Sequence, residues 1–152
     1  MAMKTLLRDR DAEEILQRIG SLIESDVRRW GRMSVQGMVC HLGDSYDLAL
    51  GLRHAEAVKL PIPVPMMKWL ALQLPLQWSR NIRTVPVVEQ GSGGRPPAAW
   101  DGDMQLLMES FHAFREKSDG WNQHPIFRAM STEEWMRWGY LHADHHLRQF
   151  GR

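Results

Sequence analysis

The stretch that decides the fold is STEEWMRWGYLHADHHLRQ, residues 131–149. Ser131 followed three residues later by Glu134 is the capping-box pattern that begins helices. From Trp135 through Trp138 and His142 to Gln149, large and polar side chains recur at helical spacing and share one broad face. We therefore predict a helix from Ser131 whose inner face carries tryptophan and histidine together.

Three earlier segments also show apolar residues at helical spacing. They are Asp11–Ser25, a segment capped by Ser34 that runs to about Leu50 before Gly51, and a segment from Asp101 or Asp103 to near Lys117. Because alternating β-branched runs are scarce, we predict an all-α fold, an antiparallel four-helix bundle with a long irregular connection between the second and third helices.

The predicted connection between the second and third helices has two parts. Leu60 to Pro65 alternates with proline and must be extended, and Met66 to Leu74 is predicted as a short helix. Asn81 to Ala99 is glycine- and proline-rich and is predicted to be irregular, which is common in lids and mobile loops. Trp121 to Met130 forms a second linker before the last helix.

Composition narrows the function classes. A chain of 152 residues suits one domain, residues 1–152, and a net charge of +1 predicts no nucleic-acid partner. Cys40 is the only cysteine, which fits a reducing compartment, so we expect a cytoplasmic protein. Leu60 to Trp78 is apolar, but Lys68 and four prolines interrupt it, so we predict no membrane span.

His142 and His146 carry the strongest chemical signal. Residues four apart lie one turn above each other on a helix, so the two imidazoles can point at one ion. His41 lies beside the apolar face of the second helix and is the best third ligand. Three histidines leave one position open on a divalent metal ion, zinc or nickel first, as in catalytic zinc sites.

Two alternatives compete with this assignment. His145 is three residues from His142 and can replace His146 as a ligand. The histidines can also be bundle residues that only form hydrogen bonds. The spacing is not the H-E-x-x-H of zinc proteases, because no glutamate follows the first histidine.

These residues resemble the DinB/YfiT-like superfamily of metal-binding four-helix bundles. Its members typically carry one histidine on the second helix and an H-x-x-x-H pair on the fourth, often followed by Arg-Gly-Gln. The matching positions are His41, and His142 with His146 ahead of Gln149, although Leu147 and Arg148 replace the Arg-Gly. The ending H-x-x-H-H-L-R-Q-F-G and His124-Pro125-Ile126-Phe127 look like one subfamily, and the resemblance spans about Asp11 to Gly151.

The resemblance implies a metal-dependent enzyme, most like a thiol-dependent S-transferase that joins a low-molecular-weight thiol to a small electrophilic substrate. A metal-dependent hydrolase is the first alternative, with Asp44, one turn beyond His41, as its base or as a hydrogen-bond partner of that histidine. A metal-binding structural module without turnover is the second. Relatives often dimerise, so we expect a homodimer, and the apolar segment Leu60–Trp78 is either its interface or a pocket wall.

Overall fold

The computed structural model describes residues 2–80, 82 and 85–152. Apart from one isolated β-bridge between His124 and Arg128, the regular structure of these residues is helical, which confirms the predicted all-α class. The elements are α1 (Asp9–Gly20), α2 (Val35–Leu50), α3 (Val64–Leu72), the 3₁₀ turn η1 (Pro86–Val88), α4 (Trp100–Glu116) and α5 (Thr132–Gln149).

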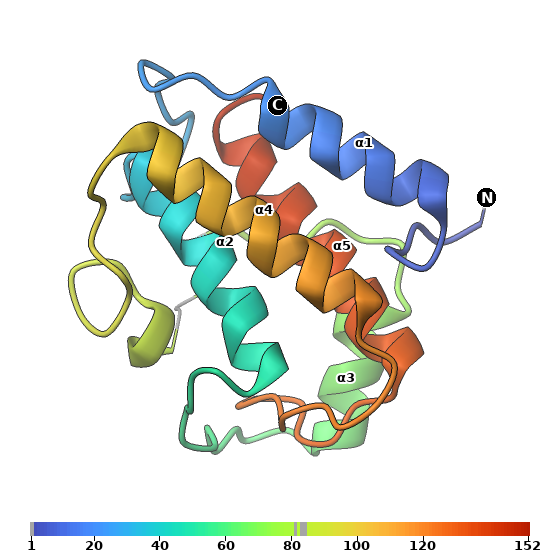
Figure 1. Ribbon diagram of the computed structural model, residues 1–152. Helices are drawn as coiled ribbons and strands as arrows, with labels where there is room; N and C mark the ends of the chain where they lie inside the picture. Colours follow the sequence, from blue (N-terminus) through green and yellow to red (C-terminus); the bar gives the residue numbers. More distant parts are fainter. Residues whose placement is uncertain (1, 81, 83–84) are drawn as a thin grey trace.

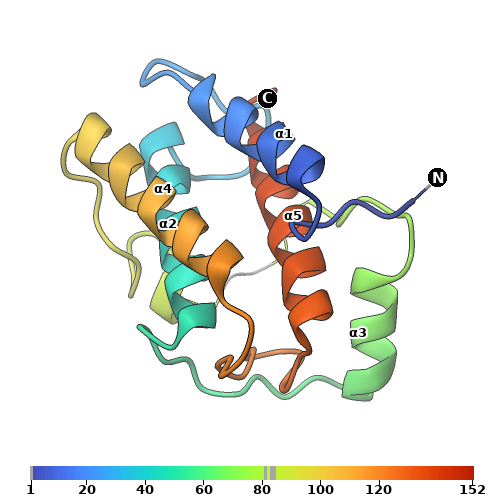
Figure 2. The same ribbon diagram turned by 45° about the vertical axis from the view of Figure 1, so that its right-hand side comes forward.

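The four long helices pack side by side as a bundle, with α3 standing beside the first turns of α5 (Figures 1 and 2). Helices α1 and α5 run in one direction, and α2 and α4 run in the other. Chain neighbours α1 and α2 are therefore antiparallel, as are α4 and α5. Helices α2 and α4 are parallel because the connection of residues 51–99 returns the chain to the end where α2 begins.

The predicted helix boundaries are confirmed where a local side chain or a glycine sets them. Ser34 Oγ accepts a hydrogen bond of 3.0 Å from the Gly37 N–H at the start of α2, and Gly51 ends that helix with a left-handed φ of 84°. At α5, the Ser131 hydroxyl and the Glu134 carboxylate form the complete capping box.

Other boundaries differ from the predictions. Helix α1 ends at Gly20 rather than Ser25, because the Asp26 carboxylate accepts a hydrogen bond from the Ile23 N–H and stabilises a turn instead. Helix α3 begins at Val64 rather than Met66, since a proline is tolerated in a first helical turn. Asn81, where the predicted irregular connection begins, lies outside the described residues.

The core lies between the four long helices. The Tyr46 hydroxyl on α2 donates to the Gly139 carbonyl on α5 at 3.2 Å, so the two helices that carry the histidines are also joined by a hydrogen bond. No described helix combines the length and apolar character needed to cross a bilayer. The largest side chains that are less than 2% exposed are Trp135, Tyr46, Phe111, Phe114, Leu6, Ile15, Ile19, Met38, Leu42, Leu72, Leu107 and Met136.

The close packing at Gly139 generates a stability prediction. A Cβ atom there would lie 2.7 Å from Phe114 Cε1 and 2.9 Å from Leu6 Cδ1, both in the core. We expect Gly139→Ala to lower the free energy of unfolding by about 1–3 kcal/mol, measured by urea denaturation, because the core must shift to accept a methyl group. The control is Gly102→Ala on the exposed start of α4, where nothing lies within 4 Å and stability should rise by about 0.5 kcal/mol. Equal effects at the two glycines would contradict the packing.

Candidate metal centre

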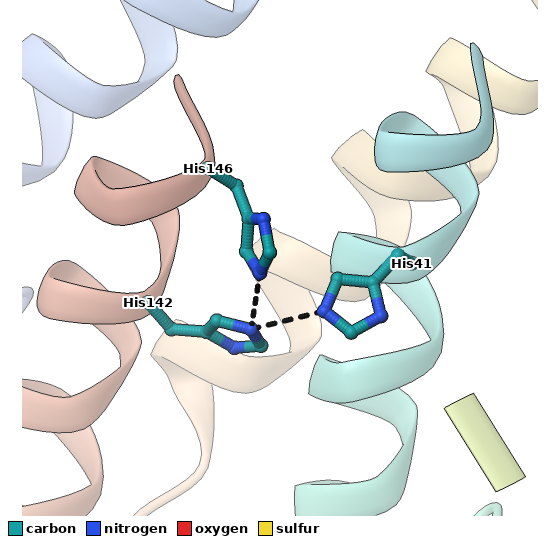
Figure 3. Close-up of side chains that lie close together, drawn as sticks. All are labelled: His41, His142 and His146. Carbon is teal, nitrogen blue, oxygen red and sulfur yellow. Dashed lines mark hydrogen bonds between the residues drawn. The ribbon is translucent and has the colours of Figure 1, made fainter. Parts of the chain in front are cut away.

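Three histidine side chains converge between α2 and α5 (Figure 3). His142 and His146 come from successive turns of α5, and His41 faces them from α2. The Nε2 atom of His142 lies 3.1 Å from Nε2 of His41 and 3.0 Å from Nε2 of His146. One nitrogen from each ring thus lies within 4.8 Å of the other two. The structure brings together the three residues predicted as metal ligands.

The outer nitrogens of two of these rings fix which nitrogen carries the proton. His41 Nδ1 lies 2.8 Å from the Val88 carbonyl oxygen, which can only accept, so Nδ1–H donates. His146 Nδ1 lies 2.7 Å from Gln149 Oε1 and donates in the same way. Each neutral ring then has a lone pair on Nε2, directed at the common centre. Metal-binding histidines commonly make this kind of outer contact to a carbonyl.

The donor set and its spacing fit a divalent ion. Two imidazole nitrogens that bind one tetrahedral zinc ion lie about 3.3 Å apart, close to the observed contacts. Without a cation, His142 Nε2 can donate its single proton to only one of its two neighbours. Its buried Nδ1 also has no hydrogen-bond partner among the described residues. Burial lowers the pKa of His41, His142 and His146, so all three are neutral, as ligands must be.

His145 is not part of the three-nitrogen group. Its ring lies 5.1 Å from the His146 ring, centroid to centroid, and packs edge-on against Trp30 at 4.9 Å. Burial lowers its pKa to about 4. The i,i+4 pair is therefore the one directed at His41, and the alternative with His145 as a ligand does not match the geometry.

The Asp44 carboxylate bonds to residues other than the three histidines. Its carboxylate accepts a 2.6 Å hydrogen bond from the Arg95 backbone N–H, and Arg53 Nη2 lies 2.9 Å from Oδ1. Val88, not Asp44, supplies the hydrogen-bond partner of His41. The predicted role of Asp44 as a partner of His41 is therefore wrong, and Asp44 is not placed to act as a base at the cluster. Its contacts tie α2 to the connection that precedes α4.

A cavity of about 750 Å³ opens against the three histidines. Its walls are mainly apolar and come from α2, α3, η1, the turn before α5, and α5 itself. Glu89, Ser45, His124 and His145 are the polar side chains that join the three histidines in the described lining. The apolar members are Leu48, Val58, Leu60, Met67, Ala71, Trp78, Ile82, Val85, Pro86, Val88, Pro125, Ile126, Phe127 and Trp138.

The structure supports one of the two alternatives for the apolar segment Leu60–Trp78, the pocket wall. Leu60, Met67 and Trp78 line the cavity, so part of the segment is a pocket wall. Trp69 and Leu70, on the outer side of α3, are 55% and 40% exposed. The predicted homodimer stays a prediction.

Val88 and Glu89 are parts of the site that the sequence does not predict. Val88 acts through its carbonyl, which any residue carries, so its identity gives no signal. Glu89 lies in the irregular connection, where the sequence has no periodicity to show which way a side chain points. The helical spacing puts Gln149 on the inner face of the last helix, but it does not identify Gln149 as the partner of His146. Its position three residues after that histidine was the available signal.

The chain belongs to the family described as "Protein of unknown function (DUF1569)", whose model matches residues 1–152. Searches of curated proteins and of solved structures found no match.

The buried histidines generate a pH prediction. A histidine in an unfolded chain titrates near pH 6.5, whereas burial lowers the pKa of His124 to about 3. Below pH 6.5 the unfolded chain binds more protons than the folded one, so stability falls as the pH falls. For His124 alone, the metal-free protein should lose about 2 kcal/mol of unfolding free energy at pH 5 relative to neutral pH.

Urea denaturation in a chelator at a series of pH values measures this loss. His124→Asn should flatten the profile by about that amount, whereas His112→Asn on the exposed side of α4 should leave it unchanged. The same slope in His124→Asn and the parent would show that His124 is not buried in its neutral form.

Proposed function

We propose that this protein is a metal-dependent enzyme with a three-histidine site, acting as a thiol-dependent S-transferase on small electrophiles. The observation that carries the proposal is the convergence of three imidazole Nε2 atoms at the wall of a cavity of about 750 Å³. One histidine on α2 and an i,i+4 pair on α5 also match the DinB/YfiT-like pattern, which supports placing the family in that superfamily.

The number of protein ligands favours catalysis over a purely structural role. Structural zinc sites are closed by four protein ligands, whereas catalytic sites use three and leave a position for another molecule. Among the described residues, the group of possible ligands contains only the three histidines. A bound divalent ion would supply a Lewis acid that lowers the pKa of a thiol or a water molecule.

The surroundings of the histidines favour a thiol over water as the nucleophile. A free thiol has a pKa near 8.5 and needs far less activation than water, at about 15.7. Asp44 is held by Arg53 and Arg95, so it offers no base beside the cluster. Glu89 is the one carboxylate in the described lining. The apolar walls, including Trp78 and Trp138, would exclude water and hold an apolar electrophile.

Metal analysis tests the site itself. We expect protein purified without chelator to contain about one divalent ion per chain, since one set of three ligands is present. His146→Ala should contain almost none, because two histidines remain. His145→Ala is the matched control and should keep the metal, as its ring is turned towards Trp30. Loss of metal from His145→Ala with retention in His146→Ala would reverse the ligand assignment.

Thiol consumption tests the reaction. With zinc- or nickel-loaded protein, a panel of low-molecular-weight thiols and an apolar electrophile such as 1-chloro-2,4-dinitrobenzene should give a rate that chelator removes. His142→Ala should lower that rate by at least about 100-fold, since it removes the central ligand. Loss of the electrophile without thiol, at the same metal-dependent rate, would favour the hydrolase instead. A metal-loaded protein that turns over neither way would favour the structural module.

A further inference from the structure

A second polar feature of the cavity is His124, which the metal centre does not use. It lies in the turn between α4 and α5 and is only 7% exposed. Its ring stacks on Phe127 with centroids 4.6 Å apart and meets Trp138 edge-on at 5.5 Å. A buried polar ring needs hydrogen-bond partners for both nitrogens, so the partners of each nitrogen indicate its role.

The Nδ1 atom of His124 is fully occupied. It accepts hydrogen bonds of 3.1 Å from the backbone N–H groups of Ile126 and Phe127. Because Nδ1 accepts, the neutral ring carries its proton on Nε2. Burial lowers the pKa of His124 to about 3, so the ring is neutral near pH 7. The turn therefore fixes His124 as a donor through Nε2.

The backbone around His124 is held equally firmly. His124 and Arg128 exchange two backbone hydrogen bonds of 2.8 Å, and Arg128 has a left-handed φ of 61°, which is rare outside glycine. The Arg128 guanidinium donates to the carbonyls of Pro125 and Val58, and the Val58 N–H donates back to Pro125. A turn with a residue in a costly backbone conformation is kept only where its surroundings enforce it.

The donor itself has no protein partner in the described part of the chain. None of the described residues accepts a hydrogen bond from His124 Nε2, and the residue lines the cavity beside the metal centre. Trp138 contacts both His124 and His142, at 5.5 and 4.7 Å between centroids. The centroids of the His124 and His142 rings are therefore separated by no more than the sum of these two distances. Both rings line the same cavity, so one small molecule can reach both.

We propose that His124 is a substrate-binding residue that donates a hydrogen bond from Nε2 to a neutral carbonyl oxygen of the molecule bound at the metal centre. This rests on the proposed function in that the same cavity holds the reacting molecule. Glu89 is the only charged side chain in the described lining, which disfavours an anionic substrate. The substrate class is a largely apolar small carbonyl compound.

The substitution His124→Asn removes the Nε2–H donor and keeps the hydrogen bonds that hold the turn. The asparagine Oδ1 takes the place of Nδ1 and can still accept from Ile126 and Phe127, whereas nothing replaces Nε2–H. His112→Asn on exposed α4 is the matched control. The probes are 4-sulfanylacetophenone and 4-isopropylbenzenethiol, which have nearly the same shape but only one of which carries a carbonyl oxygen.

Calorimetric titration of the zinc-loaded proteins gives the affinity of each probe. For each protein we compare the ratio of the affinity of 4-sulfanylacetophenone to that of 4-isopropylbenzenethiol. We expect this ratio to be about tenfold higher in the parent and in His112→Asn than in His124→Asn, which is the effect of one hydrogen bond. Comparing ratios between proteins cancels the different acidity of the two thiols. An unchanged ratio in His124→Asn would overturn the proposal.

A measurement on the parent protein covers the case in which His124→Asn does not fold or the thiols do not bind. Long-range ¹H–¹⁵N correlation spectra should show His124 with its proton on Nε2. Acetophenone should shift the Nε2 signal, and isopropylbenzene should not. Equal shifts, or a proton on Nδ1, would overturn the role of His124. A shift with acetophenone alone, without binding of either thiol, would support the role of His124 as a hydrogen-bond donor and contradict the proposed transferase function.

Discussion

The direction of two lone pairs is the constraint on which the rest of the structure depends. His41 and His146 can present Nε2 to a common point only because acceptors outside the cluster hold their Nδ1 protons. One acceptor, the Val88 carbonyl, belongs to the connection between α2 and α4. That connection must therefore fold back onto α2, and its return to the starting end of α2 makes α2 and α4 parallel. The long connection is part of the site.

Local features of the site could be predicted from the sequence. The two serine N-caps and the glycine C-cap depend on residues within one turn of each other, so Ser34, Gly51 and Ser131 set their helix boundaries as expected. The pair His142 and His146 follows from helical geometry alone. His41 could be selected because its position on the inner side of a regular helix leaves few directions for its ring.

Features that depend on contacts across the chain could not be predicted. Asp44 has the right spacing to support His41, but its carboxylate instead forms ion pairs with two arginines from the connection between α2 and α4. The residues next to Asp44 in the sequence give no sign of these partners. The real support for His41 is a backbone carbonyl, which leaves no mark on residue type. The relative directions of α2 and α4 likewise depend on the connection between them, and the sequence of that connection has no periodic pattern from which its path could be predicted.

His142 differs from its two neighbours in the way its ring is held. No described residue bonds to its Nδ1, so only its Nε2 contacts and its packing against Trp138 and Trp78, at 4.7 and 6.2 Å, orient the ring. Trp138 also packs against His124 in the lining of the same cavity. One indole thus supports both the central imidazole and the free donor. A change in its rotamer would displace both polar groups together, so an apolar side chain determines the polar geometry of the cavity.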